Sequence, residues 1–113
     1  YHDDVIAFME CCYDAMDMLV ADPEARAEYA MNLYKNEGGV TYSDEDMAAE
    51  ITNVTYWTWD MLEDSPYEFG TTMKQIGQFF MDQGLIEEGS MPAIEASLRK
   101  DILDEVVAYH KSK

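Results

Sequence analysis

Apolar residues recur every three or four positions through most of this chain, and helix start and stop residues divide that pattern into short segments. Such spacing places the apolar residues on one face of an α-helix, because the helix repeats about every 3.6 residues. A first segment, from about Asp3 to Ala21, follows the spacing closely with Val5, Phe8, Met9, Cys12, Met16, Leu19 and Val20. The pattern predicts an all-α fold, an array of about five helices packed through these faces.

Two of the expected helices begin with capping residues. Asp22 is an N-cap before Pro23 at the first helical position, and the Gly38-Gly39 pair ends that helix. Ser43, with Asp46 three residues later, is an acidic variant of the capping box. A third helix is therefore expected to begin at Ser43.

The stretch ITNVTYWTWDML, residues 51–62, is ambiguous between helix and strand. Its β-branched and aromatic residues suit a strand of about four to six residues as well as a helix. We expect the third helix to continue to about Tyr56 and an irregular aromatic turn to follow. Ser65-Pro66 and Gly70 then interrupt the periodicity.

Two further helices complete the expected array. One covers about Phe69 to Gln83, with Gly84 as its left-handed exit. Its shared apolar face consists of Met73, Ile76, Gly77 and Phe80. The last begins after Ser90, with a proline in its first turn, and we expect a break near Lys100 before its basic end.

The charge balance excludes two classes of partner. Seven basic residues against 24 acidic ones leave a formal charge of −17. That field repels nucleic-acid phosphates and anionic lipid headgroups, so neither is an expected partner. An anionic small molecule stays possible, because salt screens the field over about 8 Å. The sequence also has no apolar run of about 18 residues that could insert into a membrane.

The polar residues offer no clear catalytic or metal site. Cys11 and Cys12 are adjacent in a predicted helix, and we interpret them as reduced and partly buried, the alternatives being a vicinal disulfide or a thiol nucleophile. His2 and His110, at opposite ends of the chain, are expected to be solvated, and neither has a second ligand at zinc spacing. We therefore predict no catalytic residue, no metal ligand and no cofactor, and a protein that is not an enzyme.

One aromatic group is the candidate ligand-binding site. Its members, spread over fourteen positions, are Tyr56, Trp57, Trp59, Tyr67 and Phe69. Aromatic side chains can line a ligand groove, and in a small helical array they also fill the core or a partner contact. Both interpretations stay open from the sequence.

The stretch KQIGQFFMDQGLIEEG carries a resemblance to a known family. A helix ending in Phe79-Phe80 and followed by Gly84-Leu85-Ile86, together with the Asp22-Pro23 helix start, resembles the C-terminal third of solute-binding proteins of nitrate/sulfonate/taurine-type ABC importers. Relatives that bind thiamine-pyrimidine precursors share this pattern. The chain departs from it in its aromatic segment YWTWDMLEDSPYEFG, its long last helix and its acidity.

The resemblance implies that residues 1–113 form a single helical domain and the C-terminal part of a longer, two-lobed chain. Tyr1 in place of an initiating Met agrees with this interpretation. Two α/β lobes missing from this sequence would then hold a small-molecule solute and deliver it to an ABC permease, outside the cytoplasm. Helix faces that pack on those lobes would be open in the segment alone, so we expect it to form a homo-oligomer. The alternative is a freestanding acidic helical domain that binds a basic partner helix.

Overall fold

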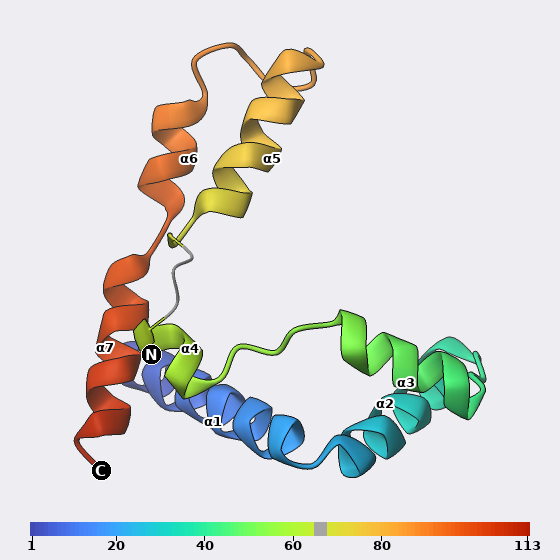
Figure 1. The fold of residues 1–113 in the computed structure, drawn as a ribbon. Helices are drawn as coiled ribbons and strands as arrows, with labels where there is room; N and C mark the ends of the chain where they lie inside the picture. The colour runs from blue at the N-terminus through green and yellow to red at the C-terminus, as the bar shows by residue number, and fades with distance from the viewer. Residues whose placement is uncertain (65–67) are drawn as a thin grey trace. The chain divides into compact units, whose positions relative to one another are not determined.

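A computed structural model describes residues 1–64 and 68–113, and these residues form seven α-helices and no β-strand (Figure 1). The helices are α1 (His2–Ala21), α2 (Pro23–Gly38), α3 (Asp44–Asn53), α4 (Trp59–Asp64), α5 (Thr71–Asp82), α6 (Met91–Ser97) and α7 (Lys100–Lys111). The predicted all-α class is confirmed. The number exceeds five because the aromatic segment contains α4 and because the last predicted helix is divided into α6 and α7.

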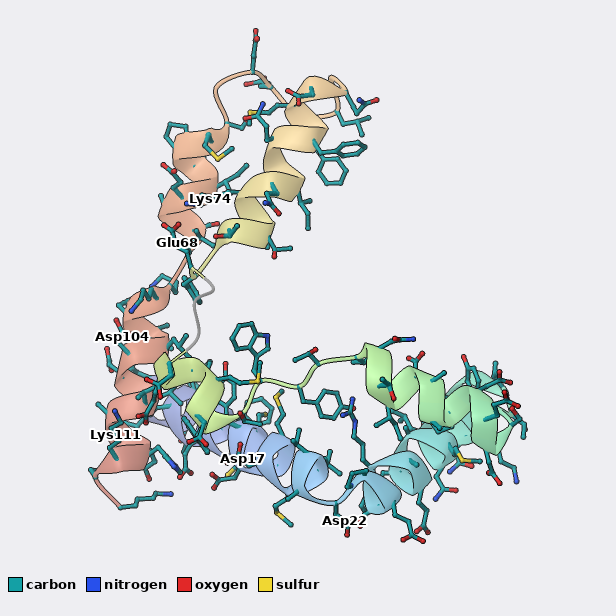
Figure 2. All side chains as sticks on the ribbon, in the orientation of Figure 1. Asp17, Asp22, Glu68, Lys74, Asp104 and Lys111 are labelled. Atoms are coloured by element: carbon teal, nitrogen blue, oxygen red, sulfur yellow. The ribbon has the colours of Figure 1, made fainter. Side chains whose placement is uncertain are left out.

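Helix α2 begins and ends as its capping residues predict. The Asp22 side chain, labelled in Figure 2, accepts a hydrogen bond of 3.0 Å from the Ala25 backbone N–H. At the other end Gly39 has a φ of 64°, and the Val40 N–H donates to the Tyr34 carbonyl at 3.2 Å. Glycine adopts the left-handed backbone conformation at little energetic cost, so the Gly38-Gly39 pair suits this helix end.

The aromatic segment contains the expected irregular stretch and, in addition, a short helix. Helix α3 begins after Ser43, whose hydroxyl accepts from the Asp46 N–H at 3.1 Å, but it ends at Asn53 rather than near Tyr56. After an extended stretch α4 begins at Trp59, where the Trp59 backbone N–H donates to the Asp17 carboxylate at 3.0 Å. An N-terminal N–H has no partner inside its own helix, so a side chain from α1 satisfies it. The expected irregular stretch is present over residues 54–58, but the helix that follows it was not predicted, because its cap comes from a distant residue.

The last three helices follow the expected boundaries closely. Helix α5 leaves through Gly84 at a φ of 68°, and the Leu85 N–H donates to the Phe80 carbonyl at 2.9 Å. Helix α6 ends at Ser97, and Leu98 is extended before α7 begins at Lys100. The predicted break near Lys100 is confirmed. The predicted interruption at Ser65-Pro66 lies outside the described residues.

The chain divides into two compact units, Tyr1–Glu63 and Asp64–Lys113, which we call the N-terminal unit and the C-terminal unit. In the N-terminal unit α1 contacts α2, and α2 contacts α3, which lies back alongside it (Figure 1). In the C-terminal unit α5 and α6 form a helical hairpin. The expectation of one domain over residues 1–113 stays a prediction.

Few apolar side chains are fully covered among the described residues. The buried ones are Ile6, Met47, Trp59 and Val106. The apolar face predicted for α1 is wrong in part, because two of its members, Val5 and Phe8, are exposed. The side of α1 that carries Asp14 and Asp17 contacts Trp59 of α4 instead. Polar partners, rather than the apolar stripe alone, therefore orient this helix.

Candidate functional site

Trp59, a member of the predicted aromatic group, is held by α1 on two sides. Its indole N–H donates to the Asp14 carboxylate at 2.8 Å, and its backbone N–H donates to Asp17. The Tyr13 ring lies 5.1 Å from the Trp59 ring, centroid to centroid, at an interplanar angle of 52°. Burial raises the pKa of the Tyr13 phenol, and the charge of Cys12 adds to that rise. Trp59 itself is 6% exposed, so its faces are not available to line an open groove.

Tyr56 lies in a different contact, with Arg26 of α2. The Arg26 guanidinium carbon is 3.9 Å from the centroid of the Tyr56 ring, a cation–π distance. The same guanidinium donates to the Val54 carbonyl at 2.6 Å. Arg26 is only 8% exposed, and it fixes the extended stretch between α3 and α4 against α2. Its role is therefore structural.

The remaining members of the group are described one by one. Trp57 is half-buried, and Phe69 is half-buried in the C-terminal unit. Tyr67 lies outside the described residues. Trp59 and Tyr56 thus contact different helices, α1 and α2, and the predicted ligand-binding role of the group stays a prediction.

A second aromatic contact joins α2 to α3 and to the loop between them. The Tyr34 hydroxyl lies 3.4 Å from a Glu50 carboxylate oxygen, and its ring is 5.2 Å from that of Tyr42. The negative charge of Glu50 raises the pKa of Tyr34, with smaller contributions from partial burial and from the hydrogen bond. Tyr34 therefore stays a neutral donor to Glu50 at physiological pH.

A hollow on the C-terminal unit lies at the end of the α5–α6 hairpin where the connecting loop joins the two helices. It encloses about 540 Å³ and is lined by Gln78, Met81, Asp82, Glu88, Gly89 and Met91. Gln78 donates to the Asp82 carboxylate at 2.8 Å, which occupies part of that lining. The hollow is broadly open to solvent and contains no member of the aromatic group, so it is a shallow acidic depression rather than a ligand pocket.

The two cysteines and the two histidines lie on helices α1 and α7. Both cysteines are free thiols, as predicted, but only Cys12 is half-buried; Cys11 is exposed, so its predicted partial burial was wrong. His110, expected to be solvated, is half-buried in the last turn of α7. Within either unit taken alone, the described residues bring no three carboxylate, imidazole or thiol ligands together for a metal ion.

The residues that sequence reasoning missed are polar. Asp14, Asp17 and Arg26 determine where the aromatic side chains lie. Arg26 could have been singled out, because the N-terminal unit has only one other basic residue, Lys35, among fifteen acidic ones. Asp14 and Asp17 could not have been singled out, because the fifteen acidic residues of this unit are too many equivalent partners for Trp59.

The comparisons with known proteins leave the family open. No protein-family model matches this chain, and neither a curated protein nor a solved structure matches it. Among the described helices, none combines the length and the apolar character needed to cross a bilayer.

Proposed function

We propose that this chain is the C-terminal helical segment of an extracytoplasmic solute-binding protein of an ABC importer. Such a protein closes two lobes on a small molecule and presents it to a permease, without catalysis. The proposal rests on the resemblance of two segments, the Asp22-Pro23 helix start and the Phe79-Phe80 helix end.

One observation supports it above the others. The apolar residues of the resembling segment lie uncovered: Phe79 is 57% exposed, Phe80 40% and Leu85 68%. Exposing a neighbouring group of large apolar side chains to water is unfavourable by about 25 cal/mol per Å². An α/β lobe in the longer chain would cover these residues and give the segment its place in the whole protein.

The decisive experiment uses the reading frame that contains this segment. We expect a secretion or lipoprotein signal followed by about 200 residues in βα alternation. The full-length protein is then screened for thermal stabilisation by nitrate, taurine, other sulfonates and thiamine-pyrimidine precursors. A solute at 100 times its dissociation constant adds about 2.7 kcal/mol to the free energy of unfolding.

The 113-residue segment alone is the matched control. Its unfolding should not respond to the same solutes, because the cleft would be formed by the missing lobes. A reading frame without upstream βα alternation, or a full-length protein that no member of the screen stabilises, contradicts the proposal.

A second candidate function has its own supporting observation. The N-terminal unit has fifteen acidic and two basic residues, a formal charge of −13, and it exposes Phe8, Tyr29 and Leu33. Apolar residues amid carboxylates suit the groove of a domain that binds a basic amphipathic helix. Binding of such a peptide, weakening steeply as salt rises from 0.05 to about 0.5 M, would favour this function over solute capture.

A further inference from the structure

The C-terminal unit has an apolar helix face that its own residues leave open. We call it the α5 face, and it consists of Met73, Ile76, Phe79 and Phe80, which are 53%, 45%, 57% and 40% exposed. The spacing places Met73, Ile76 and Phe80 on one side of α5, with Phe79 on its flank. The two phenyl rings already contact each other, with centroids 5.8 Å apart.

Helix α6 covers a different side of α5, so the predicted shared face of Met73, Ile76, Gly77 and Phe80 is wrong for Gly77. Gly77 is buried, and a side chain added there would meet Ile94 of α6. The two charged residues of α5 also lie away from the α5 face: Lys74 is 3.9 Å from Glu68, labelled together in Figure 2, and Asp82 lines the hollow towards α6. The α5 face therefore has no formal charge, in a chain whose total is −17.

We propose that the α5 face is the contact between two copies of this chain, packed antiparallel about a two-fold axis near Ile76. The absence of charge favours a neutral, apolar occupant, because a basic partner would be attracted to the carboxylates elsewhere. A second copy presents such a surface. The C-terminal unit also has nine acidic and five basic residues, a charge of −4, so two copies meet through the less repulsive of the two units.

The antiparallel arrangement is self-complementary. The two-fold axis places the Phe79-Phe80 pair of one copy over Met73 of the other and beside the two Ile76 side chains, which meet near the axis, and the reverse contact repeats it. Aromatic rings then lie against a flexible thioether and a branched aliphatic chain, which fill the space around them. The two helix dipoles also oppose each other, which is favourable for adjacent helices.

The available area is sufficient for a weak dimer. With Leu85, which follows the helix and is 68% exposed, the α5 face presents about 500 Å² per copy, if each large side chain contributes about 200 Å² when fully exposed. Two copies would bury about 1,000 Å², at the lower limit for a specific interface. A reversible dimer is therefore expected.

This inference and the proposed function assign the same surface in two different molecules, and they are tested separately. In a full-length solute-binding protein the α5 face would be occupied by the chain's own lobe, whereas the dimer belongs to the 113-residue chain. Dimerisation is measured on that chain and solute binding on the full-length protein, so either can fail without the other.

The first test is sedimentation equilibrium of the 113-residue chain over a concentration series, in about 0.15 and 0.5 M NaCl. We expect a monomer–dimer equilibrium whose association constant rises severalfold with salt, because salt screens the repulsion between acidic copies. A monomer at every concentration overturns the proposal. So does a dimer that weakens as salt rises, because such an interface would be formed by opposite charges.

A pair of charge substitutions locates the interface. Phe79→Glu places a carboxylate on the α5 face and should lower the association constant at least tenfold. Leu33→Glu, at a site on α2 that is 59% exposed, should leave it unchanged. Far-UV circular dichroism checks that both variants keep their helices. Equal effects of the two substitutions, or a larger effect of Leu33→Glu, would place the contact on another face and overturn the proposal.

Cross-linking tests the position of the two-fold axis. In a Cys11→Ser, Cys12→Ser background, Ile76→Cys lies near the axis and should form a disulfide-linked dimer readily under mild oxidation. Gln75→Cys, one residue away and turned about 100° around the helix, should cross-link at least tenfold more slowly. Equal rates for the two variants contradict the antiparallel arrangement.

Discussion

The two units are both helical, but different kinds of contact hold them together. In the N-terminal unit, polar side chains join segments far apart in the sequence: Trp59 to Asp14 and Asp17, and Arg26 to Val54. In the C-terminal unit, α5 and α6 approach at Gly77, where Ile94 fills the space of the missing side chain. The salt bridges described there join residues at most six positions apart.

The difference follows from composition. An acidic unit with a formal charge of −13 has many carboxylates, and its interior accepts some of them only where N–H donors satisfy them. The C-terminal unit is less charged and places a glycine where two helices meet. The stability of the N-terminal unit should therefore fall when a hydrogen-bond donor is removed, and that of the C-terminal unit when side-chain volume is added between its helices.

The largest expected effect is in the N-terminal unit. Trp59→Ala removes a buried ring and its contact with Tyr13, and should lower the free energy of unfolding by about 3–5 kcal/mol. Trp59→Phe keeps an aromatic ring but removes the indole donor to Asp14, and should cost about 1–2 kcal/mol. Urea denaturation followed by circular dichroism measures both. Equal costs for the two variants would show that the hydrogen bond, rather than the packing, dominates.

A substitution of Arg26 tests the loss of a hydrogen-bond donor in the same unit without removing an aromatic side chain. Arg26→Met keeps the apolar stem but removes the hydrogen bond to Val54 and the cation–π contact with Tyr56, and should cost about 2 kcal/mol. Hydrogen exchange should show the loss of protection at the Val54 and Trp59 amides, which are hydrogen-bonded at the two ends of the extended stretch between α3 and α4. Lys35→Met, an exposed substitution on the same helix, should change the stability by less than about 0.5 kcal/mol.

In the C-terminal unit the corresponding change adds volume. Gly77→Val places two methyl groups against Ile94, and overpacking of this kind should cost about 1–2 kcal/mol. Ala96→Val, on the exposed side of α6, is the matched control and should cost only a few tenths of a kcal/mol. If Gly77→Val were neutral, α5 and α6 would not be held by close approach, and the contrast between the units would fail.

The sequence predicts the helices better than it predicts their contacts. Periodicity and caps are local, so Pro23, Ser43 and Gly84 mark boundaries that the structure confirms. Helix α4 was missed because its cap, Asp17, is 42 residues away. For the aromatic group the sequence left a ligand groove and packing both open, and it did not indicate that Trp59 and Tyr56 would contact different helices, α1 and α2. Which carboxylate pairs with which donor depends on tertiary geometry that local spacing does not contain.

The smallest expected effect concerns an exposed ion pair of the C-terminal unit, Arg99 and Asp101. The guanidinium donates twice to the carboxylate, at 2.8 and 2.9 Å, and this hydrogen bonding lowers the pKa of Asp101 from its ordinary value of 3.8 to about 2. Because the folded-state pKa lies below the unfolded value, the pair stabilises the fold above pH 4 and loses that contribution as the pH falls towards 2. Both side chains are 59% exposed, so salt screens the pair and its contribution to stability is small.

Carboxyl-carbon NMR titration should find the low pKa of Asp101 in the wild-type chain and its return towards 3.8 in Arg99→Gln. If the pKa of Asp101 were the same in Arg99→Gln as in the wild-type chain, the ion pair would not persist in solution. The C-terminal unit would then depend even less on polar contacts than the N-terminal unit does.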